Sequence, residues 1–167
     1  MGEYQRLEHT FPPVYNEKSQ ILILGSFPSV KSRELEFFYG HPQNRFWKVL
    51  SLVLEKELPE TVTQKKQFLF DNHIALWDVI QSCDIIGSSD ASIKNVITTD
   101  LSEIINHSQV RHIFVNGKTA ERLYHKYSEK KIGKKAIGLP STSPANAGFS
   151  LERLCEKWKV IREYISS

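Results

Sequence analysis

The stretch Ile21-Leu-Ile-Leu-Gly-Ser-Phe-Pro-Ser29 does most to decide the fold. A short apolar run bounded by turn residues is typical of a strand that is buried on both faces. Three further runs have the same character, and they predict strands over residues 74–80, 112–115 and 136–139.

Segments with helical spacing separate and follow these strands. Apolar residues recur at intervals of three and four over residues 46–54, 120–127 and 151–165. Asp100 with Glu103 resembles a capping box, and Ser150 is suited to cap the last helix. Strands that alternate with helices predict a parallel sheet covered on both faces. We therefore expect an α/β fold, a three-layer α/β/α sandwich with a short, mainly parallel four-stranded sheet.

The composition is that of an ordinary globular protein. The chain has 167 residues, of which 40% are hydrophobic and 25% are charged, with a formal net charge of +3. This length predicts a single domain over residues 1–167. The apolar runs are too short to span a membrane, and the first residues lack the apolar stretch of a signal peptide. We expect a cytoplasmic monomer with no membrane partner.

Metal and nucleotide cofactors are not expected. The two cysteines, Cys83 and Cys155, cannot form a four-thiolate site, and no histidine lies in a metal-binding motif. The segment 25–32 nearly matches a phosphate-binding P-loop. However, Val30 replaces the glycine before its lysine, and Pro28 removes a backbone donor.

Polar residues follow each of the four predicted strands. In open parallel sheets, ligands bind beyond the carboxyl ends of the strands. Asp78 and Asn116 interrupt apolar strands there, which is costly unless a partner or ligand satisfies them. Each has a simpler interpretation, in which Asp78 caps a neighbouring turn and Asn116 forms a left-handed turn with Gly117. Together, the polar strand ends favour a site built from residues 25–29, 78, 116–117 and 140–146.

The segment Phe37-Phe-Tyr-Gly-His-Pro-Gln-Asn-Arg-Phe-Trp47 is dense in aromatic residues and leads into a helix. Its last two aromatic residues are interpreted as core residues of that helix. Phe38, Tyr39, His41 and Asn44 precede it, where side chains can project into the crevice. Aromatic faces and one amide suit a planar heterocycle extracted from a stack. The simpler alternative is that Asn44 only caps the helix.

Three motifs occur in order: Gly25-Ser-Phe-Pro-Ser29, Tyr39-Gly-His-Pro-Gln-Asn-Arg-Phe-Trp47 and Leu139-Pro-Ser-Thr-Ser-Pro-Ala-Asn146. Together they resemble the uracil-DNA glycosylase superfamily, and most closely its hypoxanthine-DNA (deoxyinosine) glycosylase branch. The resemblance extends from about Ile21 to the C-terminal helix. It implies a monofunctional DNA glycosylase that flips a deaminated base and hydrolyses its N-glycosidic bond, leaving an abasic site.

Two departures from the superfamily pattern bear on the substrate. The uracil and mismatch branches carry an Asp or Asn in the first motif that handles the attacking water, and Phe27 stands there in this chain. Leu139 replaces the His or Asn that opens the last motif in many relatives. The hypoxanthine branch similarly relies on the Asn of its Gly-His-Pro-x-Asn segment, which maps to Asn44. The resemblance therefore implies a preference for hypoxanthine over uracil.

The expected site residues fall into three groups. Asn44 is the expected catalytic residue, which positions water or steadies the leaving purine. The residues expected to contact the base are Gly25, Ser26, Phe27, Pro28, Ser29, Phe38, Tyr39, Asp78 and Asn116. The residues expected to contact DNA phosphates, or to enter the duplex as a wedge, are His41, Pro140, Ser141, Thr142, Ser143, Pro144, Ala145 and Asn146. The expected partner is DNA that contains deaminated bases.

Two other functions stay open at the level of sequence. The same crevice suits an enzyme that acts on a free nucleoside or nucleotide, or the chain is a non-catalytic DNA-binding domain. Affinity for DNA that falls as salt rises separates a DNA enzyme from a free-nucleoside enzyme. A basic cluster suits either phosphate contact or a solvated turn, and it comprises Lys130, Lys131, Lys134 and Lys135.

Overall fold

A parallel four-stranded sheet forms the centre of the computed structural model, which describes residues 2–166. Its order is β3-β2-β6-β7, with β2 at Ile21–Gly25, β3 at Ile74–Asp78, β6 at His112–Asn116 and β7 at Ala136–Leu139. Every residue of β2 and β3 is buried, as expected for apolar runs covered on both faces. The register pairs Gly25 with Asp78 and Asn116 with Leu139, so the strand ends lie side by side.

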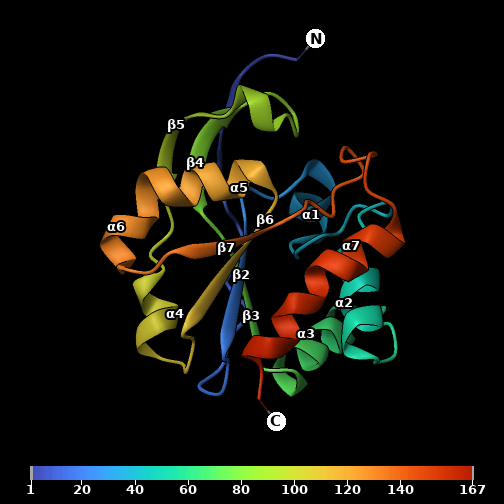
Figure 1. Cartoon of the computed structure of the whole chain (residues 1–167). Coiled ribbons are helices and arrows are strands. Elements are labelled where there is room, and N and C mark those ends of the chain that lie inside the picture. The colour runs from blue at the N-terminus through green and yellow to red at the C-terminus, as the bar shows by residue number, and fades with distance from the viewer. Residues whose placement is uncertain (1, 167) are drawn as a thin grey trace.

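Helices cover both faces of this sheet, and the three layers can be followed in Figure 1. One side carries α2 (Phe46–Leu54), α3 (Val62–Asp71) and α7 (Leu151–Trp158), the last extended by a 3-10 segment at Lys159–Tyr164. The other side carries α4 (Ser102–Asn106), α5 (Lys118–Leu123) and α6 (Glu129–Ile132), with a π-helical turn at Tyr124–Ser128. A short helix, α1 (Val30–Leu35), follows β2. The expected α/β/α sandwich is confirmed.

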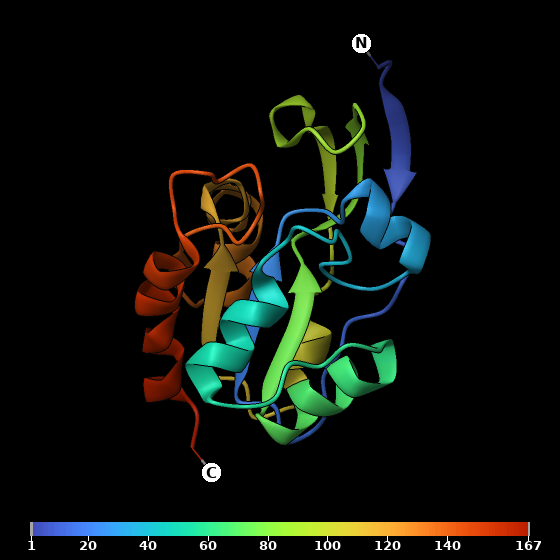
Figure 2. The same cartoon turned by 90° about the vertical axis from the view of Figure 1, so that its right-hand side faces the viewer.

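A second sheet, which the sequence analysis did not anticipate, is antiparallel. Its order is β1-β4-β5, with β1 at Gln5–Glu8, β4 at Ile80–Ile85 and β5 at Lys94–Thr98. In both views its β4–β5 end projects beyond the parallel sheet, on the side of the N-terminus (Figures 1 and 2). The strand expected over residues 74–80 therefore ends at Asp78, because Ile80 already pairs with β5.

Capping residues account for several helix ends. Ser150 accepts a hydrogen bond from the Arg153 backbone N–H and caps α7, as expected. The capping box expected at Asp100 and Glu103 is wrong. The helix α4 begins only at Ser102, and Asp100 accepts the N–H of that serine at 3.1 Å within a local turn.

The core extends over both faces of the parallel sheet, because buried side chains come from α2 and α7 on one side and from α4 and α5 on the other. Phe46 is fully buried and Trp47 is 5% exposed, which confirms both as core residues. Between residues 2 and 166, the structure contains no helix that combines the length and apolar character needed to cross a bilayer.

Candidate active site

The carboxyl ends of the parallel strands open into a cavity of about 340 Å³. Its lining includes Asn44, all the residues expected to contact the base, His41, and residues 141–145. Pro140 and Asn146 do not line it. The Pro140 carbonyl accepts a hydrogen bond from Trp158 at 2.9 Å, and the Asn146 amide donates to the Ser141 carbonyl at 3.0 Å. The fold thus brings residues from all three motifs to one cavity.

The floor of the cavity depends on the missing side chain at Gly25. A Cβ at this position would lie 2.5 Å from Oδ1 of Asp78 and 3.2 Å from the Tyr39 hydroxyl. Glycine therefore allows a carboxylate and a phenol to approach the end of β2. The Tyr39 hydroxyl is buried and has no hydrogen-bond partner among residues 2–166. Desolvation, and then the charge of Asp78, raise the pKa of Tyr39 against an opposing effect of the Asn116 amide, so the phenol stays protonated and can donate.

His9 supports Asp78, a role that no sequence motif indicates. Its Nε2 donates to Oδ2 of Asp78 at 2.7 Å, and both side chains are buried. Aromatic rings surround the imidazole, those of Phe11, Phe27, Phe38 and Trp77. The simpler interpretation of Asp78 as a turn cap does not hold, because its carboxylate pairs with His9. Oδ1, which faces Gly25 at the cavity floor, is left to accept a ligand hydrogen bond.

A chain of hydrogen bonds joins Asn44, Thr142 and Asn116. The Thr142 hydroxyl donates to Oδ1 of Asn44 at 2.9 Å and accepts from the Asn116 amide at 3.0 Å. The Thr142 backbone N–H donates to Oδ1 of Asn116 at 3.1 Å. Oδ1 of Asn44 also accepts the Phe46 N–H at 2.9 Å, at the start of α2. Both lone pairs of that oxygen are in use, so Asn44 offers a ligand only its N–H donors.

This network revises two expectations. Thr142 is fully buried and its hydroxyl is occupied, so it is not placed to contact a DNA phosphate and instead holds the two asparagines. Asn44 does bind a backbone N–H at the start of its helix, as the capping alternative supposed. Capping uses only the oxygen of the amide, so the same side chain can serve the cavity with its nitrogen.

Arg45 fastens the loop of residues 143–149 to the start of α2. Its guanidinium donates to the carbonyls of Ser143 at 3.0 Å and Asn146 at 3.1 Å, and also to the carbonyl of Phe149. Its backbone N–H donates to the Thr142 carbonyl at 3.1 Å. Both terminal nitrogens of the guanidinium bond backbone carbonyls of the loop, so this residue orders the loop.

Aromatic rings form part of the cavity wall. Tyr39 stacks on Phe46, with ring centroids 3.9 Å apart and an interplanar angle of 17°. It has a left-handed backbone conformation (φ 53°), which is uncommon for a bulky residue and is often found at functional sites. One face of the Tyr39 ring is therefore covered, while the residue still lines the cavity.

Three further residues, not expected from the sequence, also line the cavity: Ser32, Ser88 and Asp90. The Ser32 hydroxyl accepts the Gly40 N–H at 2.9 Å and thereby holds the aromatic segment. Asp90 accepts a hydrogen bond from the Ser26 hydroxyl at 3.3 Å. Residues 87–91 have the composition of an ordinary surface loop, so no pattern distinguished Asp90 in the sequence.

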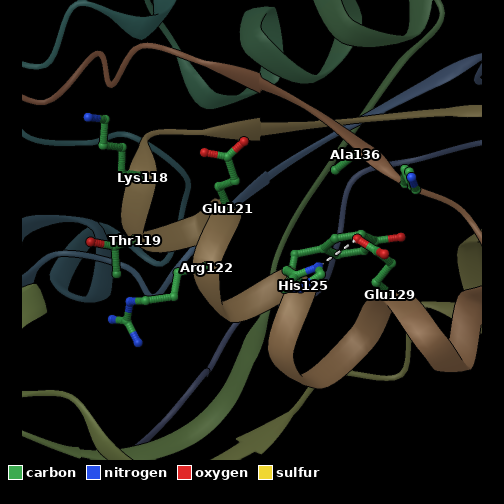
Figure 3. A pocket seen from close by; sticks show the side chains of 9 residues that line it. Lys118, Thr119, Glu121, Arg122, His125, Glu129 and Ala136 are labelled. Carbon is green, nitrogen blue, oxygen red and sulfur yellow. Dashed lines mark hydrogen bonds and ion pairs between the residues drawn. The ribbon is translucent and has the colours of Figure 1, made fainter.

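A second cavity, of about 650 Å³, lies between α5 and β7 (Figure 3). None of the expected site residues lines it. Its charges are mixed and partly paired, since His125 bonds Glu129 at 3.1 Å and Glu121 lies against Gly138 of β7. The cavity at the strand ends is therefore the better candidate. Among residues 2–166, no three His, Cys, Asp or Glu side chains are grouped to hold a metal ion.

Comparison with known proteins identifies the family. The profile described as "Uracil DNA glycosylase superfamily" matches residues 12–164. The chain belongs to the uracil DNA glycosylase superfamily. This confirms the resemblance seen in the three motifs, and it confirms the expected enzyme class, a DNA glycosylase, at the level of the family.

Two archaeal proteins and one solved structure are similar to this superfamily member. A hypoxanthine DNA glycosylase from Methanosarcina acetivorans is 33% identical over 157 residues, covering 93% of this chain and 98% of the relative. A hypoxanthine DNA glycosylase from Methanosarcina barkeri is 40% identical over 86 residues, covering 51% of this chain and 54% of the relative. The solution NMR structure of a candidate uracil DNA glycosylase from Methanosarcina acetivorans superposes with a TM-score of 0.77 at 33% identity, covering 90% of this chain and 93% of that one.

Proposed function

We propose that this protein flips a deaminated base out of DNA into the cavity, hydrolyses its N-glycosidic bond, and prefers hypoxanthine to uracil. The observation that carries the proposal is the arrangement of hydrogen-bonding groups at the cavity floor. Oδ1 of Asp78 is a buried acceptor, whereas the Asn44 amide and the Tyr39 hydroxyl are donors. The names of the two archaeal relatives point to the same substrate.

Hypoxanthine matches this arrangement and adenine opposes it. Deamination turns the N6 donor of adenine into an O6 acceptor and gives N1 a proton. The N1–H of hypoxanthine can then donate to Asp78, while O6 accepts from Asn44 or Tyr39. Adenine would place its N1 acceptor against the carboxylate. Each buried group left unpaired costs about 1–3 kcal/mol, so adenine is rejected.

Uracil presents a similar N–H and carbonyl, so hydrogen bonding does not separate it from hypoxanthine. We assign the discrimination between hypoxanthine and uracil to position 27, where uracil-processing branches carry a polar residue for the attacking water. Phe27 offers an apolar ring instead, is 8% exposed, and lines the cavity. A ring at this position favours the larger purine, which has more surface to cover.

The residues have distinct roles in the proposed reaction. As the bond between C1′ and N9 of the purine breaks, its electron pair passes to the base. The fixed Asn44 N–H and Tyr39 O–H donors then stabilise negative charge on the leaving purine. The loop of residues 143–146 forms the rim of the cavity and is suited to contact the flanking DNA. The overall charge of +3 predicts affinity for DNA that weakens as salt is raised.

The test is a set of matched DNA duplexes that each contain hypoxanthine, uracil, xanthine or a thymine mismatch at one position. Purified protein is incubated with each duplex, and abasic sites are detected by alkaline cleavage of the strand. We expect the hypoxanthine duplex to react fastest. Efficient reaction of uracil with intact hypoxanthine would contradict the preference. No reaction with any duplex, but hydrolysis of free deoxyinosine, would support a nucleoside hydrolase instead.

A further inference from the structure

The connection between β4 and β5 reaches the cavity as a fixed loop. Two hydrogen bonds tie residues 86–92 to α1, and a third closes the loop on itself. The Arg33 guanidinium donates to the Gly87 carbonyl at 3.1 Å, the Val30 N–H donates to the Ser88 hydroxyl at 2.9 Å, and the Ile86 N–H donates to the Ser92 hydroxyl at 2.8 Å. The loop ends in a short 3-10 helix, η1 (Asp90–Ser92). Asp90 therefore enters the cavity lining from an anchored segment.

Asp90 lies next to the first motif. Its Oδ1 accepts a hydrogen bond from the Ser26 hydroxyl at 3.3 Å, and Ser26 directly precedes Phe27. A carboxylate has about four lone-pair sites, so this bond leaves acceptor capacity for a water molecule. A carboxylate from the antiparallel sheet is thus brought beside the position where Phe27 supplies no polar group.

The other polar side chains of the cavity are poorly suited to take a proton from water. Oδ1 of Asn44 already accepts two hydrogen bonds. Asp78 is held by His9 on one oxygen, and its other oxygen is assigned to the base. His41 accepts the Gln43 N–H at its Nδ1, at 3.1 Å, which leaves a donor at Nε2 in the neutral ring. Asp90 is the remaining carboxylate in the cavity lining.

We propose that Asp90 is a catalytic residue that accepts a proton from the attacking water; this inference rests on the proposed function. One O–H bond of the water breaks as its oxygen bonds to C1′, and the proton passes to the Asp90 carboxylate. The bond between C1′ and N9 breaks with its electron pair on the purine. The carboxylic acid then returns the proton to the departing base or to solvent, so no oxidant or further reactant is needed.

The electrostatic surroundings favour this role. Desolvation raises the pKa of Asp90, and the charge of Asp78 acts in the same direction. Hydrogen bonds from Ser26 and Thr119 and the charge of Arg122 oppose the rise. A carboxylate with a raised pKa is a stronger base than one with the usual pKa of aspartate. Activity should therefore fall on the acid side at a higher pH than an ordinary aspartate would give.

The test compares Asp90→Asn with the wild-type protein and with the matched control Asp84→Asn. Asp84 lies on the same hairpin but bonds Arg6 and Asn95. Single-turnover release of hypoxanthine from a duplex is measured across pH, and duplex affinity is measured separately by fluorescence anisotropy. An amide at position 90 can still accept from Ser26 but cannot take a proton. We expect Asp90→Asn to react about a hundredfold more slowly, to lose the acid-side fall in rate, and to keep its DNA affinity. Asp84→Asn should react at the wild-type rate.

The outcomes separate this inference from the proposed function. If the wild-type protein releases hypoxanthine and Asp90→Asn does so within about threefold of the wild-type rate, the role of Asp90 is overturned. An unchanged acid-side profile in a slow variant would also overturn it, because it would indicate a structural role through Ser26. If the wild-type protein itself releases no base, the proposed function fails first.

Discussion

The parallel and antiparallel sheets contribute to one cavity in different ways. The parallel sheet delivers its groups at strand ends, with Gly25, Asp78 and Asn116 held by the register of buried strands. The antiparallel sheet delivers His9 just after β1 and Asp90 between β4 and β5. The first sheet thus forms the floor of the cavity, which meets the base in the proposed function. The second sheet braces that floor and adds a carboxylate at the side.

The two sheets divide the work of the site between them. Strands buried on both faces leave little freedom at their ends, which suits recognition of a rigid base. The strands β1 and β5 are mostly exposed, so the second sheet is held largely by backbone pairing and by contacts such as Arg6 with Asp84. Substitutions in the two sheets should therefore separate recognition of the base from support of the cavity floor.

The largest effect is expected at Asn44, which belongs to the parallel-sheet side of the cavity. Asn44→Ala removes the N–H donors that face the leaving base, and we expect single-turnover release of hypoxanthine to fall by about a hundredfold or more. DNA affinity should change little. Gln43→Ala is the matched control, because this neighbouring amide is exposed. Near-normal turnover of Asn44→Ala would exclude it as the catalytic residue.

A smaller loss of rate is expected when a side chain is added at Gly25, at the end of β2. A methyl group at this position would lie 2.5 Å from Oδ1 of Asp78 and must displace it. Losing the hydrogen bond to N1–H costs about 1–3 kcal/mol, so Gly25→Ala should slow release by about ten- to a hundredfold. Gly148→Ala is the control, since a methyl group there meets nothing within 4 Å. Equal rates for the two variants would contradict the floor assignment.

His9 tests the bracing role of the antiparallel sheet. His9→Phe leaves Oδ2 of Asp78 buried among aromatic rings without its donor, so we expect release to slow by about tenfold. The free energy of unfolding should fall by about 3 kcal/mol, which urea titration can measure. Adding Asp78→Asn to this variant should restore part of the stability but not the rate. Restored activity in the double variant would show that Asp78 only balances His9.

Arg45 should affect DNA binding more than chemistry. Arg45→Lys keeps the charge but cannot bond three carbonyls with one ammonium group, so the loop of residues 143–149 becomes less ordered. We expect duplex affinity to weaken by about threefold to tenfold, the cost of ordering a few side chains on binding. The dependence of affinity on salt should keep its slope, because Arg45 contacts no phosphate in this account. A reduced slope would instead place Arg45 on the DNA backbone.

No effect is expected from removing metal ions. Neither sheet brings three metal-ligating side chains together among residues 2–166. Prolonged treatment with a chelator should therefore leave the rate of hypoxanthine release unchanged. A loss of activity that added metal restores would reveal a site that this account lacks.

The two sheets also differ in how far sequence predicts them. The strands of the parallel sheet are uninterrupted apolar runs, and their polar ends mark the cavity. The strands β1 and β5 are short and rich in polar residues, and the partner of β1 lies far away in sequence, as with Arg6 and Asp84. Pairing of that kind leaves no local pattern. His9 directly follows β1 and could not be assigned for this reason, whereas Asp90 lies in a connection with the composition of an ordinary loop.

Side-chain bonding limited what the motifs could predict. Thr142 and Asn44 were both identified as site residues, but which of their atoms remain free depends on contacts across 98 positions. The buried Thr142 hydroxyl and the occupied oxygen of Asn44 follow only from the folded arrangement. Residue type therefore located the site, while hydrogen-bond partners decided which group can act.

The most direct test of the account identifies the product itself. Purified protein is incubated with a duplex containing one hypoxanthine, and the mixture is divided for mass spectrometry and for strand analysis with and without alkali. We expect free hypoxanthine in solution and a DNA strand that breaks only after alkali. An intact inosine nucleotide, or a strand cut without alkali and without free base, would contradict it.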